Sequence, residues 1–142
     1  MKTVADYRRE IGDARGVIIA GYGGANINIE EGSEYSPLAL IRELLEDLRP
    51  VVITSQVPLG TADFVYTNGA RPIQLGAIPG VDLLIPECQV RLGFLLGRWD
   101  SLVEEAGSLE EAFRRLKEIF LSGVKFRNRE SRRLFGEMTE LE

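Results

Sequence analysis

The sequence predicts a three-layer α/β domain, in which a small parallel sheet of about four strands lies between helices. Two short apolar runs, 16–21 and 51–55, are typical of strands that are buried on both faces. An amphipathic segment at 37–48 separates them, which makes a strand–helix–strand unit. At 142 residues the chain is about the size of one domain, so we expect a single domain over 1–142.

Local signals predict the elements of the first half of the chain. Residues 1–15 are polar with scattered apolar positions and predict one short helix. Ser36 suits the N-cap of the next helix and Pro37 its first position, and Arg49-Pro50 ends it. Its predicted buried face consists of Leu38, Ile41, Leu44, Leu45 and Leu48.

The stretch after the second strand is rich in glycine and proline. It predicts a loop, a short helix near 69–75 and a short extended piece around 77–84. Pro86 suits the first position of a helix that runs to about Leu96, with Gly97 as its C-terminal cap. Because this helix is apolar almost all round, we expect it to be buried.

Two capping boxes predict helix starts near the end of the chain. Ser101 with Glu104 and Ser108 with Glu111 have the required spacing. The second box opens an amphipathic helix, whose apolar face is expected to be formed by Leu109, Phe113, Leu116, Ile119 and Phe120.

Composition excludes several kinds of chemistry. The chain has no histidine and one cysteine, so it cannot build a Ser-His-Asp triad, a Cys-His pair or a histidine metal site. We expect no metal, no cofactor and an inert core thiol at Cys88. The net charge of −5 opposes broad binding to nucleic acid. The absence of a signal peptide and of a long apolar run favours a cytoplasmic protein with no membrane partner.

The first candidate binding segment follows the first strand. Ligands of open parallel sheets bind beyond the carboxyl ends of the strands. There the chain reads Gly-Tyr-Gly-Gly-Ala-Asn, which brings Tyr22, Gly23, Gly24 and Asn26 to that edge. This G-x-G-x-x-N pattern lacks the third glycine of the dinucleotide fingerprint, so it argues against NAD or FAD. A glycine-rich turn without a ligand is the common alternative.

The second candidate segment follows the second strand and contains Ser55, Gln56 and Asp63. Ser55 has neither histidine nor a nearby lysine as a base. Asp63 could serve as one, but Ser55 and Gln56 as hydrogen-bonding loop residues and Asp63 as a helix cap are commoner outcomes. The basic cluster within 125–133 could touch phosphate, although a solvated helix face is the commoner role.

These segments, in this order, resemble the C-terminal domain of the bacterial and archaeal L-asparaginase family, especially its type I, cytoplasmic branch. The asparaginase-like subunit of archaeal Glu-tRNA(Gln) amidotransferase shares this domain. The resemblance covers roughly 13–139. Its marks are Gly16–Asn26, Val51–Gln56, Gly60 with Asp63 and Tyr66, Gly76–Gly80 with Asp82, Leu95–Gly97, and Gly136–Thr139.

The resemblance implies a domain that assists catalysis without supplying the nucleophile. In the family the nucleophilic threonine, a Thr-Asp pair and a lysine belong to an N-terminal domain, whose segments do not occur here. The C-terminal domain provides secondary contacts to the substrate site of a neighbouring subunit. Asn26 matches an asparagine that contacts substrate across the dimer, and Gln56 and Asp63 match the type I Ser-Gln and Gly-x-x-Asp motifs. By this resemblance the substrate-contacting set is Tyr22, Gly23, Gly24, Asn26, Ser55, Gln56 and Asp63, and no catalytic residue is expected in this chain.

The chain also departs from the family pattern. Ala20 and Val57 stand where effector-binding type I enzymes have arginine and cysteine, and the usual Asp-Met-Thr run reads Asp82-Leu-Leu here. Three hypotheses follow: a domain that completes a separate N-terminal-domain chain, a non-catalytic module that binds an amino acid or acts as a dimeric scaffold, and a fragment of a longer enzyme. In each we expect a homo-oligomer, because a small α/β unit leaves open sheet edges. We expect the isolated chain to be inactive as an asparaginase.

Overall fold

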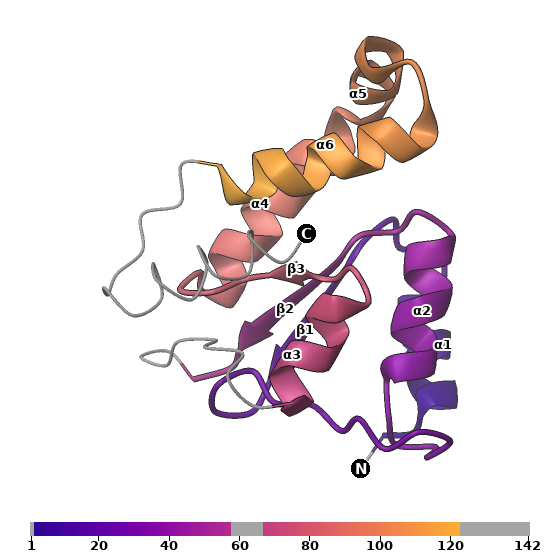
Figure 1. Ribbon diagram of the computed structural model, residues 1–142, viewed down its shortest axis with the longest axis vertical. Helices are drawn as coiled ribbons and strands as arrows, with labels where there is room; N and C mark the ends of the chain where they lie inside the picture. The colour runs from indigo at the N-terminus through magenta and orange to yellow at the C-terminus, as the bar shows by residue number, and fades with distance from the viewer. Residues whose placement is uncertain (1, 58–66, 123–142) are drawn as a thin grey trace.

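The computed structural model of the chain describes residues 2–57 and 67–122, and it confirms the α/β class (Figure 1). Within these residues the sheet has three parallel strands in the order β1-β2-β3, one fewer than expected. The strands are β1 (Val17–Gly21), β2 (Val51–Ser55) and β3 (Ile78–Pro79). All three therefore end at one edge of the sheet, where the candidate site was expected.

One face of the sheet is covered by the first three helices (Figure 1). These are α1 (Val4–Ile11), α2 (Leu38–Glu46) and α3 (Thr67–Gln74). The apolar face of α2 packs on β2 through Ile41 and Leu44, which are 0% and 3% exposed. The predicted helices at 1–15, 37–48 and 69–75 are confirmed, each with slightly different ends.

The last three helices lie together on the other side of the sheet, where the first of them packs on the strands (Figure 1). These are α4 (Ile85–Gly97), α5 (Trp99–Ala106) and α6 (Leu109–Leu121). Leu92 and Leu95 of α4 and Leu116 and Phe120 of α6 belong to one buried cluster with Val52 of β2. The described residues thus form the predicted three layers.

Several predicted helix caps are wrong. The Ser36 hydroxyl does not cap α2, because it donates to the Asn28 carbonyl at 3.0 Å instead. Gly97 is the last residue of α4, with Arg98 at the C-cap, and Ser101 lies inside α5. The Ser108 cap is confirmed, since its hydroxyl accepts from the Glu111 N–H at 3.2 Å.

Burial also differs from the sequence prediction, both in the sheet and in the helical layer formed by α4 and α6. β2 is fully buried, but β1 is the terminal strand of the sheet in the described residues, and most of it is only half-buried. α4 buries one face only, and its outer face is exposed. Leu109 and Ile119 of α6 are likewise 50% and 43% exposed. The apolar composition of these elements predicted that they would be buried. Their outer sides stay exposed because nothing among the described residues packs against them.

Among the described helices, none is both long and apolar enough to cross a membrane.

Candidate functional site

The chain folds into a tight loop directly after β1. The Tyr22 and Asn26 backbones pair in an antiparallel bridge, with Tyr22 N–H donating to the Asn26 carbonyl at 3.0 Å and Asn26 N–H to the Tyr22 carbonyl at 2.9 Å. Gly23 and Ala25 make the reversal with φ angles of +52° and +70°. This bridge holds 22–26 against the carboxyl end of β1.

Gly21 is required by this loop. A Cβ at Gly21 would lie 2.5 Å from the backbone carbon of Ala25 and 2.6 Å from its oxygen. Ala25 is itself completely buried, so the loop has no room to move away without losing packing. The glycine of the predicted motif therefore serves close backbone approach at this position.

Ser55 ties the loop after β2 to the loop after β1. Its hydroxyl donates to the Gly23 carbonyl and accepts from the Val57 N–H at 3.0 Å, and the residue is only 6% exposed. Gln56 N–H donates to the Gly21 carbonyl at 3.0 Å, which extends the strand pairing by one bond. Six of the seven predicted residues thus lie at one edge: Tyr22, Gly23, Gly24, Asn26, Ser55 and Gln56.

The third strand reaches the same edge through residues outside the predicted binding set. A Cβ at Gly80 would lie 2.8 Å from the Thr54 Cβ, so Gly80 packs directly on β2. The Thr54 hydroxyl donates to the Leu83 carbonyl at 2.8 Å in a buried position. Val81, at φ +50°, and the buried Asp82 follow. The Gly76–Gly80 motif with Asp82 was the sequence signal for this third loop.

Two residues at this edge have strained backbone conformations. Ala25 and Val81 are two of the non-glycine residues with positive φ, and Val81 is β-branched, for which this conformation is especially unfavourable. Both are buried, at 0% and 4% exposure, so tertiary packing holds them there. Such strain concentrates at binding and catalytic sites more often than elsewhere.

Three polar side chains at this edge make no hydrogen bond within the part of the chain that the structure describes. They are the Tyr22 phenol, which belongs to a residue 74% exposed, the half-buried Asn26 amide and the exposed Gln56 amide. Together they offer donors and acceptors to a small polar ligand. Asp63 lies outside the described residues, as do Gly60, Tyr66, Gly136–Thr139 and the basic cluster.

Nucleophilic chemistry has little support at this edge. The Ser55 hydroxyl is committed to two backbone partners, so its proton is directed at a carbonyl and not at a base. Cys88 is completely buried, and this burial raises the pKa of its thiol to about 11, so almost no thiolate forms at neutral pH. No cluster of three acidic or cysteine side chains in 2–57 and 67–122 could hold a metal ion. The geometry fits binding through neutral polar groups.

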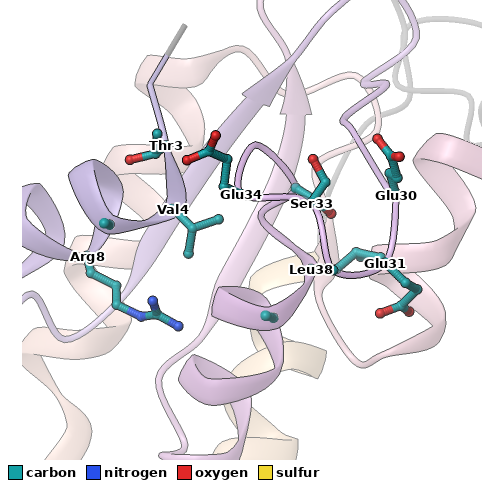
Figure 2. A pocket seen from close by; sticks show the side chains of 12 residues that line it. Thr3, Val4, Arg8, Glu30, Glu31, Ser33, Glu34 and Leu38 are labelled. Carbon is teal, nitrogen blue, oxygen red and sulfur yellow. The ribbon is translucent and has the colours of Figure 1, made fainter.

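Two hollows on the described surface lie elsewhere. One, of about 330 Å³, lies between the start of α1, the 30–34 loop and the start of α2, and Arg8, Glu30, Glu31 and Glu34 are among the side chains that line it (Figure 2). The other, of about 420 Å³, lies near the amino ends of β1 and β2, beside Trp99. None of the predicted site residues lines either one.

The fold and this edge define a small parallel α/β domain whose glycine-rich strand-end loops present polar groups. No family model matches the chain. Over 110 residues, which is 77% of the chain, it is 34% identical to a glutamyl-tRNA(Gln) amidotransferase subunit from Methanosarcina acetivorans. The aligned part is 24% of that relative, so the chain spans about a quarter of its length. This similarity supports an asparaginase-like relationship, in agreement with the motifs.

Proposed function

We propose that the chain is a C-terminal-type domain of an asparaginase-like amidohydrolase that positions substrate and makes subunit contacts, while another domain supplies the nucleophile. The similarity to part of an amidotransferase subunit carries this proposal. The loops after β1 and β2 support it, because the Ser55 hydroxyl links them into one edge. Positioning groups of this kind can contribute greatly to rate without touching the bond that breaks.

The substrate class follows from the groups at this edge and from the resemblance. Tyr22, Asn26 and Gln56 carry one phenol and two amides, and these suit the amide and ammonium groups of an amino-acid amide. Amide hydrolysis would proceed through an acyl-enzyme formed on the other domain. The proposal also includes a homo-oligomer in the cytoplasm. It includes no cofactor, and nucleic-acid contact is not part of it.

A non-catalytic module that binds an amino acid or acts as a scaffold is the second candidate. One observation favours it: the polar residue of the family's Asp-Met-Thr run is replaced, and Leu83 and Leu84 follow the buried Asp82. An edge that lost polar groups in this way has fewer contacts to a reacting substrate but can still hold a ligand.

Calorimetric titration with asparagine, aspartate, glutamine and glutamate tests the binding part of the proposal. We expect one of the four to produce heat with the wild-type chain, and Asn26→Ala to abolish it. Asn28→Asp is the matched control, because its carboxylate can still accept from the Glu30 N–H as the Asn28 side chain does at 2.9 Å. Silence with all four ligands would contradict ligand binding by the isolated chain and favour a scaffold.

Mixing experiments test the catalytic part. The chain alone should release no ammonia from asparagine. It should do so when it is combined with a separately produced chain that carries the Gly-Gly-Thr nucleophile segment and is inactive by itself. Hydrolysis by the purified chain alone would refute the assignment of the nucleophile to another domain. Failure of the two chains to associate would refute the role as a completing domain.

A further inference from the structure

The cavity of about 420 Å³ near the amino ends of β1 and β2 is lined by both apolar and charged side chains. Its volume falls within the range of small-molecule sites, which is roughly 300–1,000 Å³. The apolar part of the lining comes from the end of α2 and from α4, α5 and α6, and consists of Leu48, Leu96, Trp99 and Leu109. An apolar lining with a few polar groups is typical of sites that hold small organic ligands.

Part of this apolar lining is fixed and part is open. Leu96 and Trp99 are partly buried and pack against the core cluster on the α4 side of the sheet. A Cβ at Gly16 would lie 2.9 Å from the Leu96 Cδ1, so Leu96 also packs closely on the start of β1. Leu109, by contrast, is 50% exposed. The cavity therefore offers apolar surface to the apolar group of a ligand.

Three charged side chains of the lining have no partner within residues 2–57 and 67–122. Asp13 and Arg15 lie on the segment before β1, and Asp47 is the C-cap residue of α2. All three are exposed, and their side chains make no hydrogen bond or ion pair in that part of the chain. They are therefore available to a ligand in the cavity.

The fourth charged residue of the lining, Arg49, positions two of these groups. Its Nε donates to the Ala14 carbonyl at 2.8 Å, which ties the segment before β1 to the end of α2. Asp13 and Arg15 flank Ala14 in the chain. The contact thus holds both residues beside the same cavity as Asp47.

The charges of the lining favour a ligand that carries both signs. The lining has two arginines and two aspartates, so its formal charges cancel, and a ligand with a net charge gains little overall. A zwitterion can place its carboxylate at Arg15 and its ammonium group at Asp47 or Asp13. An amino acid with a large apolar side chain has these two charges together with a group that suits the apolar lining.

We propose that this cavity binds a free amino acid with a large apolar side chain. Its carboxylate meets Arg15, its ammonium group meets the aspartates, and its side chain packs on Trp99 and Leu109. This inference goes beyond the proposed function, because the cavity lies at the other ends of the strands and shares none of the residues proposed there. For so small a ligand we expect a dissociation constant on the order of millimolar.

Tryptophan fluorescence of the full chain tests the proposal, because Trp99 is its only tryptophan. L-leucine and L-phenylalanine are titrated to about 20 mM, and at least one should change the emission and saturate. The same amino acid should raise the midpoint of urea unfolding, since a ligand of the folded chain stabilises it. Its amide, which lacks the carboxylate, and its N-acetyl form, which lacks the ammonium group, should each bind about tenfold more weakly or worse.

Three variants test the location of the site. Arg15→Gln and Asp47→Asn should each weaken binding about tenfold, because each removes one charged contact. Leu109→Ala should weaken it about fivefold through the loss of apolar surface. All three residues are substantially exposed, so these variants should keep the fold. Asp100→Asn is the matched control, because Asp100 follows Trp99 in the chain without lining the cavity, and it should bind as wild type does.

The possible results separate this proposal from the proposed function. Unchanged fluorescence and an unchanged urea midpoint with both amino acids would refute it. Equal binding of the amide or the N-acetyl form would refute recognition of both charges. Binding that Arg15→Gln and Asp47→Asn leave intact would refute the assignment to this cavity. Asn26→Ala, which tests the strand-end edge, should leave binding here unchanged, so each proposal can fail without the other.

Discussion

Replacement of Gly21 by alanine should lower the free energy of unfolding more than a glycine-to-alanine change elsewhere in the candidate site. The new Cβ would lie 2.5, 2.6 and 2.9 Å from the C, O and Cα atoms of Ala25, which are all backbone atoms. The 22–26 loop would have to move, which endangers the two Tyr22–Asn26 hydrogen bonds and the bond from Ser55 to Gly23. Overpacking costs about 1–3 kcal/mol and each lost bond about 1 kcal/mol. We expect a loss of about 2–4 kcal/mol in the free energy of unfolding.

Two further glycine-to-alanine variants test whether the close approach of the Gly21 and Ala25 backbones causes this loss. At Gly23, with φ +52°, a Cβ meets nothing within 4 Å, so Gly23→Ala should cost only the backbone strain of about 1 kcal/mol. At Gly16, a Cβ meets mainly the flexible ends of Leu96 and Leu92 at 2.9 and 3.1 Å, which can shift. Urea denaturation followed by circular dichroism gives all three values. If Gly21→Ala proved no more destabilising than Gly23→Ala, the close-approach argument would be refuted.

Three further changes test other parts of the structure. Leu48 follows the C-cap residue Asp47 of α2 and has φ +55°, and the Leu48 and Arg49 N–H groups donate to the Leu45 and Leu44 carbonyls. Leu48→Gly should therefore be about 1 kcal/mol more stable in urea denaturation than Leu48→Ala, because both variants lose the half-buried leucine side chain and only glycine relieves the backbone strain; equal stabilities would contradict the strain argument. The buried Cys88 thiol, with its pKa raised to about 11, should react with a disulfide reagent far more slowly at pH 8 than after unfolding in urea, and equal rates would contradict its burial. Hydrogen bonds from Arg114 and Arg115 lower the pKa of Glu111 from 4.5 to about 2, so its contribution to stability is present above pH 4.5 and lost as the pH falls toward 2. The stability difference between wild type and Glu111→Gln should shrink over that range in acid titrations of unfolding, and a constant difference would contradict it.

Much of the fold was predictable because its elements carry strong local signals. The 51–55 run became a fully buried strand, and Ser108 became a helix cap. The wrong predictions concern residues whose role depends on distant partners. Ser36 has the chemistry of a cap, but its hydroxyl bonds the Asn28 carbonyl, which the chain brings near by folding back. Ser101 has the spacing of a capping box, but α5 had already begun at Trp99.

The sequence predicted which residues lie at the candidate edge but not the contacts that they make there, and their binding of a ligand stays a prediction. The motif placed Tyr22–Asn26 and Ser55-Gln56 at one edge, because parallel strands end together. It did not reveal that Ser55 would use its hydroxyl to join the two loops, or that Val81 would be held at φ +50°. Both features depend on contacts between segments far apart in the chain.

The sequence by itself determined that the chain has no histidine-based chemistry, because that follows from composition. It also determined the order of most strands and helices along the chain, because local patterns depend on neighbouring residues. Tertiary structure alone decided which apolar residues stay exposed. The outer face of α4 and the half-buried β1 have the composition of core elements, yet they lie at the margin of the described layers. Burial depends on what packs against an element, and only the assembled chain specifies that.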